Sequence, residues 1–476
     1  MPQPLSAKTF SNKSILPVKI LQFGEGNFLR AFSDWCIQKM NAEIGFNGGI
    51  AVVQPIENGL LHLLENQDGL YHHMIRGLNN GVKYDEIELI DCIQNTINPF
   101  EQPDNYFQQA KNPELSIVIS NTTEAGIQYL ADDIPGSGQL AKTFPGKLTQ
   151  LLKMRFEHFK GSHDSGLVFI PCELIENNGY ELKECILKYA ALWNLGTGFE
   201  SWIEQSNYFA NTLVDRIVPG FPKDEIEAIQ ERIGFEDQLV VSSEVFHLWV
   251  IQGPKEVKER FPADKAGLNV KFVDDIAPYR TRKVRILNGA HTCMVPIGLL
   301  DGIETVRENV EHEVIGAFIQ QAIDEEIAST IDLPEEELKA FSDEVIERFK
   351  NPFIRHELKS IALNSISKFR VRVLPTIKDY LADRTELPTK LLFSLACLIR
   401  LYHDSNFKIT DDQIVIDYFH KIQNTKLDEQ LVGELLAREA FWGEDLTLIK
   451  GLKELISKYL GLLETHSATE VVKEVF

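Results

Sequence analysis

The sequence predicts two domains, an α/β domain with a mostly parallel sheet over residues 1–275 and an all-helical domain over residues 276–476. From residue 18 to about residue 275, short runs of β-branched and other apolar residues alternate with longer amphipathic segments. The runs cover residues 18–23, 50–53, 86–93, 116–120, 167–171, 239–241 and 269–273. Continuous apolar strands that alternate with helices are typical of a parallel sheet covered on both faces.

The helical domain is indicated by a change of period near residue 280. The strand pattern stops there, and apolar positions then recur every three or four residues, for instance in 391–401 and 431–440. With 476 residues, of which 44% are hydrophobic, the chain is long enough to bury two cores.

The charge balance limits the classes of partner. The 48 Lys and Arg residues against 70 Asp and Glu residues leave a net charge of −22. Such an acidic balance favours solubility and argues against binding to nucleic acid or to an anionic membrane; the partner that we expect is a small molecule. An anionic substrate would need a local basic pocket. The sequence leaves the oligomeric state open, and a monomer is compatible with it.

The cysteines and the N-terminal segment indicate a cytoplasmic protein. Six cysteines are dispersed without a C-x-x-C pair: Cys36, Cys92, Cys172, Cys185, Cys293 and Cys397. This pattern predicts free thiols in a reducing compartment. The first twenty residues lack the features of a secretory signal, and no apolar stretch reaches the roughly 18 residues of a membrane span.

A glycine turn at residues 24–30 (GEGNFLR) joins the first strand to a helix. Gly24 would make the tight turn, and Gly26 would let a pyrophosphate approach the backbone at the helix N-terminus. The third glycine of the usual pattern is absent, because Leu29 stands there. A structural turn without a ligand is the alternative. We expect the following residues to contact a dinucleotide: Gly24, Gly26, Asn27, Phe28 and Arg30.

Two further loops are candidates for the cofactor ribose groups. Gln54 stands at the end of the second strand, where an acidic residue usually accepts the adenosine ribose hydroxyls, so Glu57 is predicted to serve instead. Asn121 and Thr122 follow the strand at 116–120, and loops at the carboxyl ends of parallel strands line the binding crevice. These two residues are predicted to meet the nicotinamide ribose, with an ordinary helix cap as the alternative.

The segment 283–291 (KVRILNGAH) supplies groups for proton transfer. On an α-helix, Lys283, Asn288 and His291 fall within an arc of about 140°. Hydride transfer to or from an alcohol carbon requires a proton on the oxygen, which a lysine can exchange when burial lowers its pKa, while an asparagine amide stabilises the oxyanion. His291 would hold a substrate hydroxyl or orient Lys283. The alternative is two surface groups and a core histidine.

These motifs together resemble those of the mannitol dehydrogenase family of polyol-specific long-chain dehydrogenases. The similarity covers nearly the whole chain and rests on GEGNFLR at 24–30, VDRIVP at 214–219 and the K-x4-N-x2-H spacing from Lys283. The resemblance implies a metal-independent NAD(H) enzyme with a Rossmann-type first domain and a helical second domain, and with hydride transfer at the cleft between them. It also implies that Lys283 is the general acid/base and that Asn288 lies in an oxyanion hole.

A second oxyanion-hole asparagine is implied by the segment 171–179 (PCELIENNG). It is similar to the family's Cys-Asp-Asn segment that ends in Asn-Gly, which points to Asn178, with Asn177 left open. Within the family, the glycine turn and the LNGAHT segment are most similar to the tagaturonate reductases, which act on hexuronates. Mannitol and fructuronate remain alternative substrates, and a protein that senses NAD without turnover is a more distant one.

A hexuronate carboxylate requires a cation, and the segment 368–372 (KFRVR) provides three. An extended conformation would place all three on one face. We expect Lys368 and Arg372 to bind the carboxylate, with a solvated basic face as the alternative. The sequence contains no H-E-x-x-H, and His356-Glu357 is not followed by a second histidine at helical spacing, so no metal is expected. The choice between NAD and NADP is left open, with NAD favoured.

Overall fold

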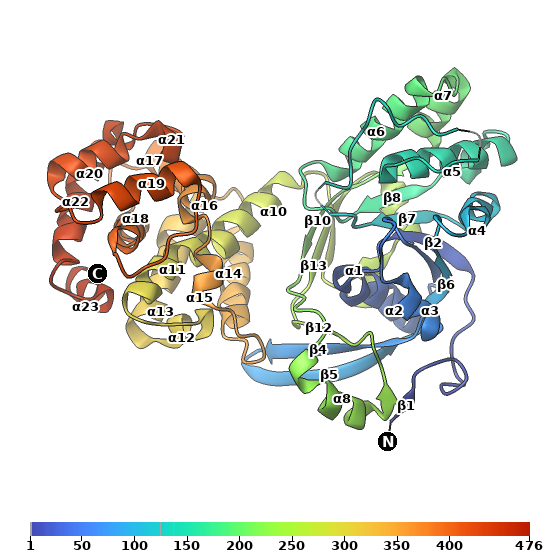
Figure 1. Ribbon diagram of the computed structural model, residues 1–476, viewed down its shortest axis with the longest axis horizontal. Coiled ribbons are helices and arrows are strands. Elements are labelled where there is room, and N and C mark those ends of the chain that lie inside the picture. Colours follow the sequence, from blue (N-terminus) through green and yellow to red (C-terminus); the bar gives the residue numbers. More distant parts are fainter. Residues whose placement is uncertain (1, 124, 137) are drawn as a thin grey trace. The chain divides into compact units, whose positions relative to one another are not determined.

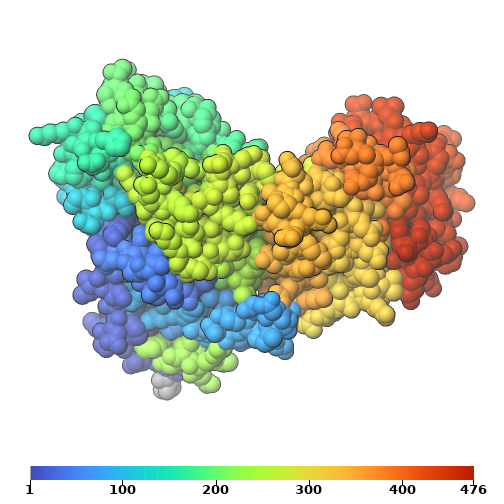
Figure 2. Space-filling view, turned by 180° about the vertical axis from the view of Figure 1, so that it is seen from behind, coloured from blue at the N-terminus to red at the C-terminus, as the bar shows by residue number. Residues whose placement is uncertain are grey.

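The computed structural model describes residues 2–123, 125–136 and 138–476, and the chain divides into two compact units (Figure 1). The first comprises Met1–Arg76 and Lys83–Ile276, and the second comprises Gly77–Val82 and Ala277–Phe476. In the second unit, the residues after 277, coloured yellow to red, are closely packed (Figure 2). The first unit is an α/β domain and the second is helical, which confirms the predicted fold class.

A six-stranded sheet forms the centre of the first unit. Its strands run in the order β6-β3-β2-β7-β8-β9, and every neighbouring pair is parallel. The strands are β2 (Val18–Phe23), β3 (Gly49–Val53), β6 (Ile93–Ile97), β7 (Ile117–Ser120), β8 (Val168–Pro171) and β9 (Tyr208–Phe209). The chain builds outward from β2 in one direction and then from β7 in the other. Ligands of such sheets bind at the carboxyl ends of the strands where the order reverses, here between β2 and β7.

The central strands are mostly apolar because both faces of the sheet are buried. Alternate residues of β2 enter two different cores, Ile20 on one face and Leu21 and Phe23 on the other, and all three are fully buried. Burial of each such side chain contributes about 1.5–3 kcal/mol. The covering helices are α1 (Asn27–Ala31), α2 (Ser33–Ile44), α3 (Leu61–Asn66), α4 (Pro103–Gln108), α5 (Phe144–His158), α6 (Asn178–Leu192), α7 (Thr197–Ser206) and α9 (Lys255–Arg260).

Smaller sheets complete the first unit. The additional elements are β1 (Gln3–Pro4), β4 (Tyr71–Asn79), β5 (Val82–Ile90), β10 (Asn211–Asp215), β11 (Phe235–Glu236), β12 (Val241–Ser243), β13 (Leu248–Gln252), β14 (Val270–Val273) and α8 (Ile226–Ile233). The prediction of one strand over 86–93 is wrong, because β5 ends at Ile90 and β6 begins at Ile93. Between them the carboxylate of Asp91 accepts hydrogen bonds from Ser14 N and Gln38 Nε2, which hold the chain out of both strands.

The second unit is built around α11 (Gly289–Leu300), which is buried from Gly289 to Gly298. The surrounding helices are α10 (Ala277–Arg282), α12 (Val306–Glu311), α13 (Glu313–Gln321), α14 (Glu335–Phe349), α15 (Leu358–Ile361), α16 (Ser365–Arg372), α17 (Leu374–Asp383), α18 (Thr389–His403), α19 (Gln413–Ile422), α20 (Glu429–Leu436), α21 (Glu439–Trp442), α22 (Leu452–Leu462) and α23 (Ala468–Val475). α11 packs against α18, which is buried along most of its length. No helix within the described part of the chain has both the length and the apolarity to cross a bilayer.

A π-helical turn, η5 (Lys283–Asn288), joins α10 to α11. Its backbone hydrogen bonds run from i to i+5, and such turns are frequent at functional sites. The arc estimated from the sequence assumed a regular α-helix and is therefore wrong for this segment. In a π turn, residues five apart lie on adjacent turns, so the backbone positions of Lys283 and Asn288 are closer to one face than an α-helix would allow.

Candidate active site

The glycine turn has the backbone that a dinucleotide requires. Gly24 adopts a φ of +123°, and a Cβ there would lie 3.0 Å from the carbonyl oxygen of Asn121 and 3.0 Å from Leu29 Cδ1. Glycine is the residue that adopts this conformation without steric strain. A Cβ on Gly26 would meet nothing within 4 Å, so this side of the turn is open to a ligand. Gly26 also begins α1 without a side-chain cap, which leaves the start of the helix accessible to a phosphate.

Arg30 supports the turn from inside the protein. Its side chain is buried, donates from Nε to the Glu25 carbonyl at 3.2 Å and from Nη2 to Asn27 Oδ1 at 2.6 Å, and also donates from Nη1 to the Leu239 carbonyl. The guanidinium is thus committed to protein acceptors. The geometry does not support the prediction that Arg30 contacts the phosphates. The hydrogen bond from Arg30 Nη2 also holds the side chain of Asn27 in place. The ring of Phe28 stacks on the ring of Phe32, with 5.0 Å between the ring centroids.

The loop after β7 is organised by a buried carboxylate that the sequence did not single out. Glu173 is 2% exposed and accepts from Ser120 Oγ, Thr122 N and Thr122 Oγ1, each at 3.0 Å. Burial raises its pKa, and these hydrogen bonds partly offset that effect. Glu173 therefore ties the end of β8 to the end of β7. Asn121 donates its backbone N–H to the Phe23 carbonyl at 3.0 Å, beside the glycine turn.

Asn178 has a structural environment. It is fully buried, and its Nδ2 donates to the carbonyls of Pro171 and Glu173 at 3.1 Å and to that of Thr212 at 3.2 Å. Its Oδ1 accepts from Gly179 N at 2.9 Å and from Thr212 N. An amide has two N–H groups, and both are engaged within the fold. The geometry does not support Asn178 as a donor to a substrate oxyanion.

Asn288 and Lys283 lie at the two ends of the π turn, and both are half-buried. Among the described residues, none forms a hydrogen bond with the side-chain amide of Asn288, whose backbone carbonyl accepts from Thr292 Oγ1 at 2.8 Å. The amide is thus available to a substrate oxygen. Neighbouring Arg282 pairs with Glu337 at 2.8 Å, and Arg285 donates to the Thr330 carbonyl at 3.1 Å.

His291 is buried one turn further along, at the centre of a basic cluster. Its ring lies 4.3 Å from that of Phe349 and 5.0 Å from that of His356, and its Nε2 is buried without a hydrogen-bond partner in the described structure. Burial lowers the pKa of His291 well below its usual value. Four further groups lower the pKa in the same direction: His356, Arg348, Arg372 and Lys368. The imidazole is therefore neutral.

The segment 368–372 is helical, so the extended conformation considered from the sequence is wrong. Lys368 and Arg372 are four residues apart on α16 and share a face. Lys368 Nζ donates to the Ile361 carbonyl at 2.8 Å. The side chain of Arg370 instead approaches Gly443, where a Cβ would lie 3.3 Å from its Cδ.

Arg372 is half-buried, and no described residue pairs with its guanidinium. Its backbone lies close to α11, since a Cβ on Gly289 would be 3.6 Å from the Arg372 carbonyl oxygen. The structure thus brings four of the predicted residues together in the second unit: Asn288, His291, Lys368 and Arg372.

Comparison with known proteins identifies the family. The model of the mannitol dehydrogenase Rossmann domain matches residues 18–265, and the model of the mannitol dehydrogenase C-terminal domain matches residues 275–462. The chain belongs to the mannitol dehydrogenase family. This family member is 45% identical to the altronate oxidoreductase of Phocaeicola vulgatus, over 98% of this chain and 99% of that one. It is 45% identical to the altronate oxidoreductase of Bacillus subtilis, over 96% and 95%.

Solved structures agree with the fold of this mannitol dehydrogenase family member. A substrate-free D-sorbitol dehydrogenase matches with a TM-score of 0.83 and 19% identity, over 98% of this chain and 100% of that one. The mannitol 2-dehydrogenase of Pseudomonas fluorescens, in a ternary complex with NAD and D-mannitol, matches with a TM-score of 0.65 and 21% identity, over 100% and 96%. At these identities the likeness shows the common fold.

The motif at 214–219 has a structural part in the family fold. The guanidinium of Arg216 is buried, lies 4.3 Å from the Trp35 ring, and donates to the carbonyls of Glu244 at 3.0 Å and Ala31 at 2.8 Å. It therefore fastens the segment after β10 to the helices that follow the glycine turn. Asp215 is buried beside it.

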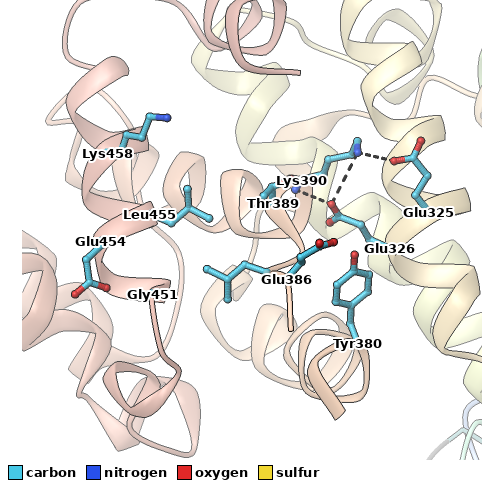
Figure 3. A pocket seen from close by; sticks show the side chains of 11 residues that line it. Glu325, Glu326, Tyr380, Glu386, Thr389, Lys390, Gly451, Glu454, Leu455 and Lys458 are labelled. Atoms are coloured by element: carbon cyan, nitrogen blue, oxygen red, sulfur yellow. Dashed lines mark hydrogen bonds and ion pairs between the residues drawn. The ribbon is translucent and has the colours of Figure 1, made fainter. Parts of the chain in front are cut away.

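A separate cavity in the helical unit has the wrong charge for an anionic substrate (Figure 3). It has a volume of about 720 Å³ and is lined by Glu325, Glu326, Tyr380, Glu386, Leu387, Thr389, Lys390, Gly451, Glu454, Leu455 and Lys458. Glu326 accepts from the backbone N–H groups of Lys390 and Leu391 at the start of α18. None of the predicted site residues lines this cavity. No group of three or more metal-ligating side chains occurs within residues 2–123, 125–136 and 138–476.

Sequence reasoning missed the histidine and arginine that complete the basic cluster. The pair His356-Glu357 bears only on metal binding as a sequence motif, and no motif includes Arg348. Both belong to segments more than fifty residues from His291, and no local pattern distinguishes them from surface charges. The buried Glu173 did carry a signal, because an acidic residue directly after an apolar strand lies at the ligand-binding edge of a parallel sheet.

Proposed function

We propose that this protein interconverts tagaturonate and altronate with NADH and NAD. Membership of the mannitol dehydrogenase family makes it an NAD-dependent dehydrogenase that acts on CH–OH groups. Its relatives named altronate oxidoreductases support a sugar-acid substrate. The residues around Gly24 and Gly26 fit the pyrophosphate, since the turn is open at Gly26, and Asn121 and Thr122 remain proposed contacts to the nicotinamide ribose.

The observation that carries the choice of a hexuronate is the basic cluster around His291. Arg348, Arg372 and Lys368 act on His291 and lower its pKa, although the chain has a net charge of −22. Arg372 offers a guanidinium that a carboxylate can engage through two hydrogen bonds. Lys368 adds a second cation, and Asp411 is the carboxylate that acts on it. A substrate carboxylate would be attracted to these cations, whereas a neutral polyol would gain no such attraction.

The proposed chemistry follows from the residues of the π turn. A dinucleotide held at Gly24 and Gly26 would provide the hydride for the carbonyl carbon of the substrate. The Lys283 ammonium donates a proton to the carbonyl oxygen, so that the ketone becomes a secondary alcohol and Lys283 becomes a neutral amine. The Asn288 amide donates a hydrogen bond to the same oxygen while negative charge develops on it. The neutral imidazole of His291 accepts or donates a hydrogen bond at an adjacent hydroxyl through Nε2. Solvent then reprotonates the lysine.

A substrate panel tests this proposal. Oxidation of NADH is followed with tagaturonate, fructuronate and fructose, and the panel is repeated with NADPH. We expect tagaturonate to exceed neutral fructose by at least about 100-fold in kcat/KM, because two cation contacts each contribute roughly tenfold or more. A preference for fructose would refute the carboxylate pocket. A preference for fructuronate would retain the pocket and change the substrate. Binding of NADH without turnover of any of these compounds would favour a sensor.

A further inference from the structure

The end of β3 lacks the acidic residue that usually accepts the adenosine ribose hydroxyls in this kind of fold. Gln54 occupies that position and is buried. Its Nε2 donates to the carbonyls of Ile56 at 2.9 Å and Glu57 at 3.1 Å. The Gln54 side chain is therefore used to shape the loop that follows β3, and the ribose acceptor must come from another residue.

The carboxylate of Glu25 reaches this place from the glycine turn. Its Oε1 accepts the backbone N–H of Leu60 at 3.1 Å. A Cβ on Gly59 would lie 2.4 Å from Glu25 Oε1 and 2.5 Å from Gln54 Cδ, so the carboxylate and the Gln54 side chain meet across Gly59. Two segments that both belong to the proposed cofactor site are thereby joined by one side chain.

We propose that Glu25 accepts the adenosine ribose hydroxyls and selects NAD over NADP. Oε1 is anchored by Leu60, whereas Oε2 has no hydrogen-bond partner within the described residues. A carboxylate held at one oxygen is well placed to accept from a diol with the other. The inference rests on the proposed use of NAD at the glycine turn.

The surroundings of Glu25 disfavour a ribose 2′-phosphate. The loop at 54–60 (QPIENGL) contains no lysine or arginine, and the guanidinium of Arg30 is committed to protein acceptors. A phosphate next to the Glu25 carboxylate would thus meet a like charge, and the N–H groups of Arg30 that donate to Glu25, Leu239 and Asn27 are not free to bind it. Ile56 and Leu60 are 61% and 54% exposed, which provides apolar surface for an adenine ring.

Glu57 is the competing acceptor, because it lies in the same loop. Its side chain is exposed, and its backbone carbonyl is held by Gln54. An exposed carboxylate loses more side-chain freedom and more hydration when it binds a hydroxyl than one already anchored by an N–H. Glu25 is therefore the better-organised group of the two.

The test measures cofactor binding in the absence of substrate. NADH and NADPH fluorescence titrations are carried out on the wild-type protein, Glu25→Gln and Glu57→Gln. Glu25→Gln keeps an acceptor for Leu60 N–H and removes the charge. We expect it to weaken NADH binding by about tenfold, since a hydrogen bond to a charged group is worth at least that factor. It should strengthen NADPH binding by about tenfold, because the like charge next to the 2′-phosphate is removed. Glu57→Gln should leave the NADPH/NADH ratio within about threefold of the wild type, which is the range of an exposed charge.

Two outcomes overturn the assignment. The first is an unchanged ratio in Glu25→Gln, and the second is a shift in Glu57→Gln that equals or exceeds the shift in Glu25→Gln. If Glu25→Gln does not fold, Glu25→Asp replaces it, because the shorter carboxylate should lose NADH affinity without gaining NADPH affinity, and a gain in NADPH affinity would refute the proposal. A wild-type protein that binds neither cofactor would refute the proposed function itself.

Discussion

Replacement of Arg372 by methionine isolates the proposed carboxylate contact. Methionine keeps the unbranched stem and helix propensity and removes the guanidinium. A hydrogen bond between a guanidinium and a carboxylate is worth about 1.5–3 kcal/mol, and Arg372 is only half-buried, so solvent screening favours the lower half of that range. Because 1.4 kcal/mol corresponds to a factor of ten, we expect kcat/KM for tagaturonate to fall about 10- to 30-fold.

The same helix offers a matched control. Arg370 lies two residues earlier on α16 and approaches Gly443 instead of α11. Arg370 is half-buried, as Arg372 is, and because its side chain points toward Gly443, Arg370→Met should change kcat/KM by less than about twofold. The assay is NADH oxidation with tagaturonate and with fructose, together with thermal unfolding of each variant. Equal losses in both variants, or an equal loss with fructose in Arg372→Met, would show that Arg372 does not recognise the carboxylate.

Three further predictions address the proton donor, the glycine turn and the acid stability. Lys283→Ala should lower kcat by about 100- to 10,000-fold while NADH binding in titrations stays unchanged; full turnover in this variant would disprove the proposed mechanism. Gly24→Ala should destabilise the protein by about 1–3 kcal/mol in urea unfolding because of its φ of +123°, whereas Gly26→Ala should unfold like the wild type and bind NADH more weakly. Burial lowers the pKa of His247 from 6.5 to about 3, so below pH 6.5 the unfolded state binds more protons than the folded state and stability falls as the pH falls. His247→Gln, whose amide oxygen can accept the Asn269 N–H that now reaches His247 Nε2 at 2.9 Å, should show a shallower dependence of the urea midpoint between pH 6.5 and 5, and identical slopes would contradict this account.

The central sheet was predictable because strands that are buried on both faces are rich in apolar residues. Four of the six residues of Val18–Phe23 are apolar and enter the two buried faces, and the sequence predicts this strand with the bounds that the structure has. The prediction of a single strand over 86–93 was wrong because this run contains the last residues of β5 and the first residue of β6. Composition does not show where a strand ends when a polar residue such as Asp91 separates two apolar segments.

The candidate site was predictable where the backbone imposes a residue type. Gly24 must be glycine, and its position after the first strand reveals the turn. The roles of Arg30 and Asn178 could not be predicted from the sequence. The sequence does not show whether a guanidinium or an amide donates to a ligand or to buried carbonyl groups of the protein. His356 and Arg348 reach His291 through tertiary packing alone, which no local pattern encodes.

Because of the π turn, the direction of the Lys283 side chain depends on the number of residues between Lys283 and Asn288 as well as on their identity. A π turn accommodates one residue more than the α turn that it replaces. Removal of a single residue from 284–287 would allow a continuous α-helix, and Lys283 would then rotate by about 100° relative to α11. Lys283, Asn288 and His291 would all be retained, yet the side chain of Lys283 would project from a different side of the helix. Sequence alignments that open a gap within these four positions would consequently superpose lysines that point in different directions.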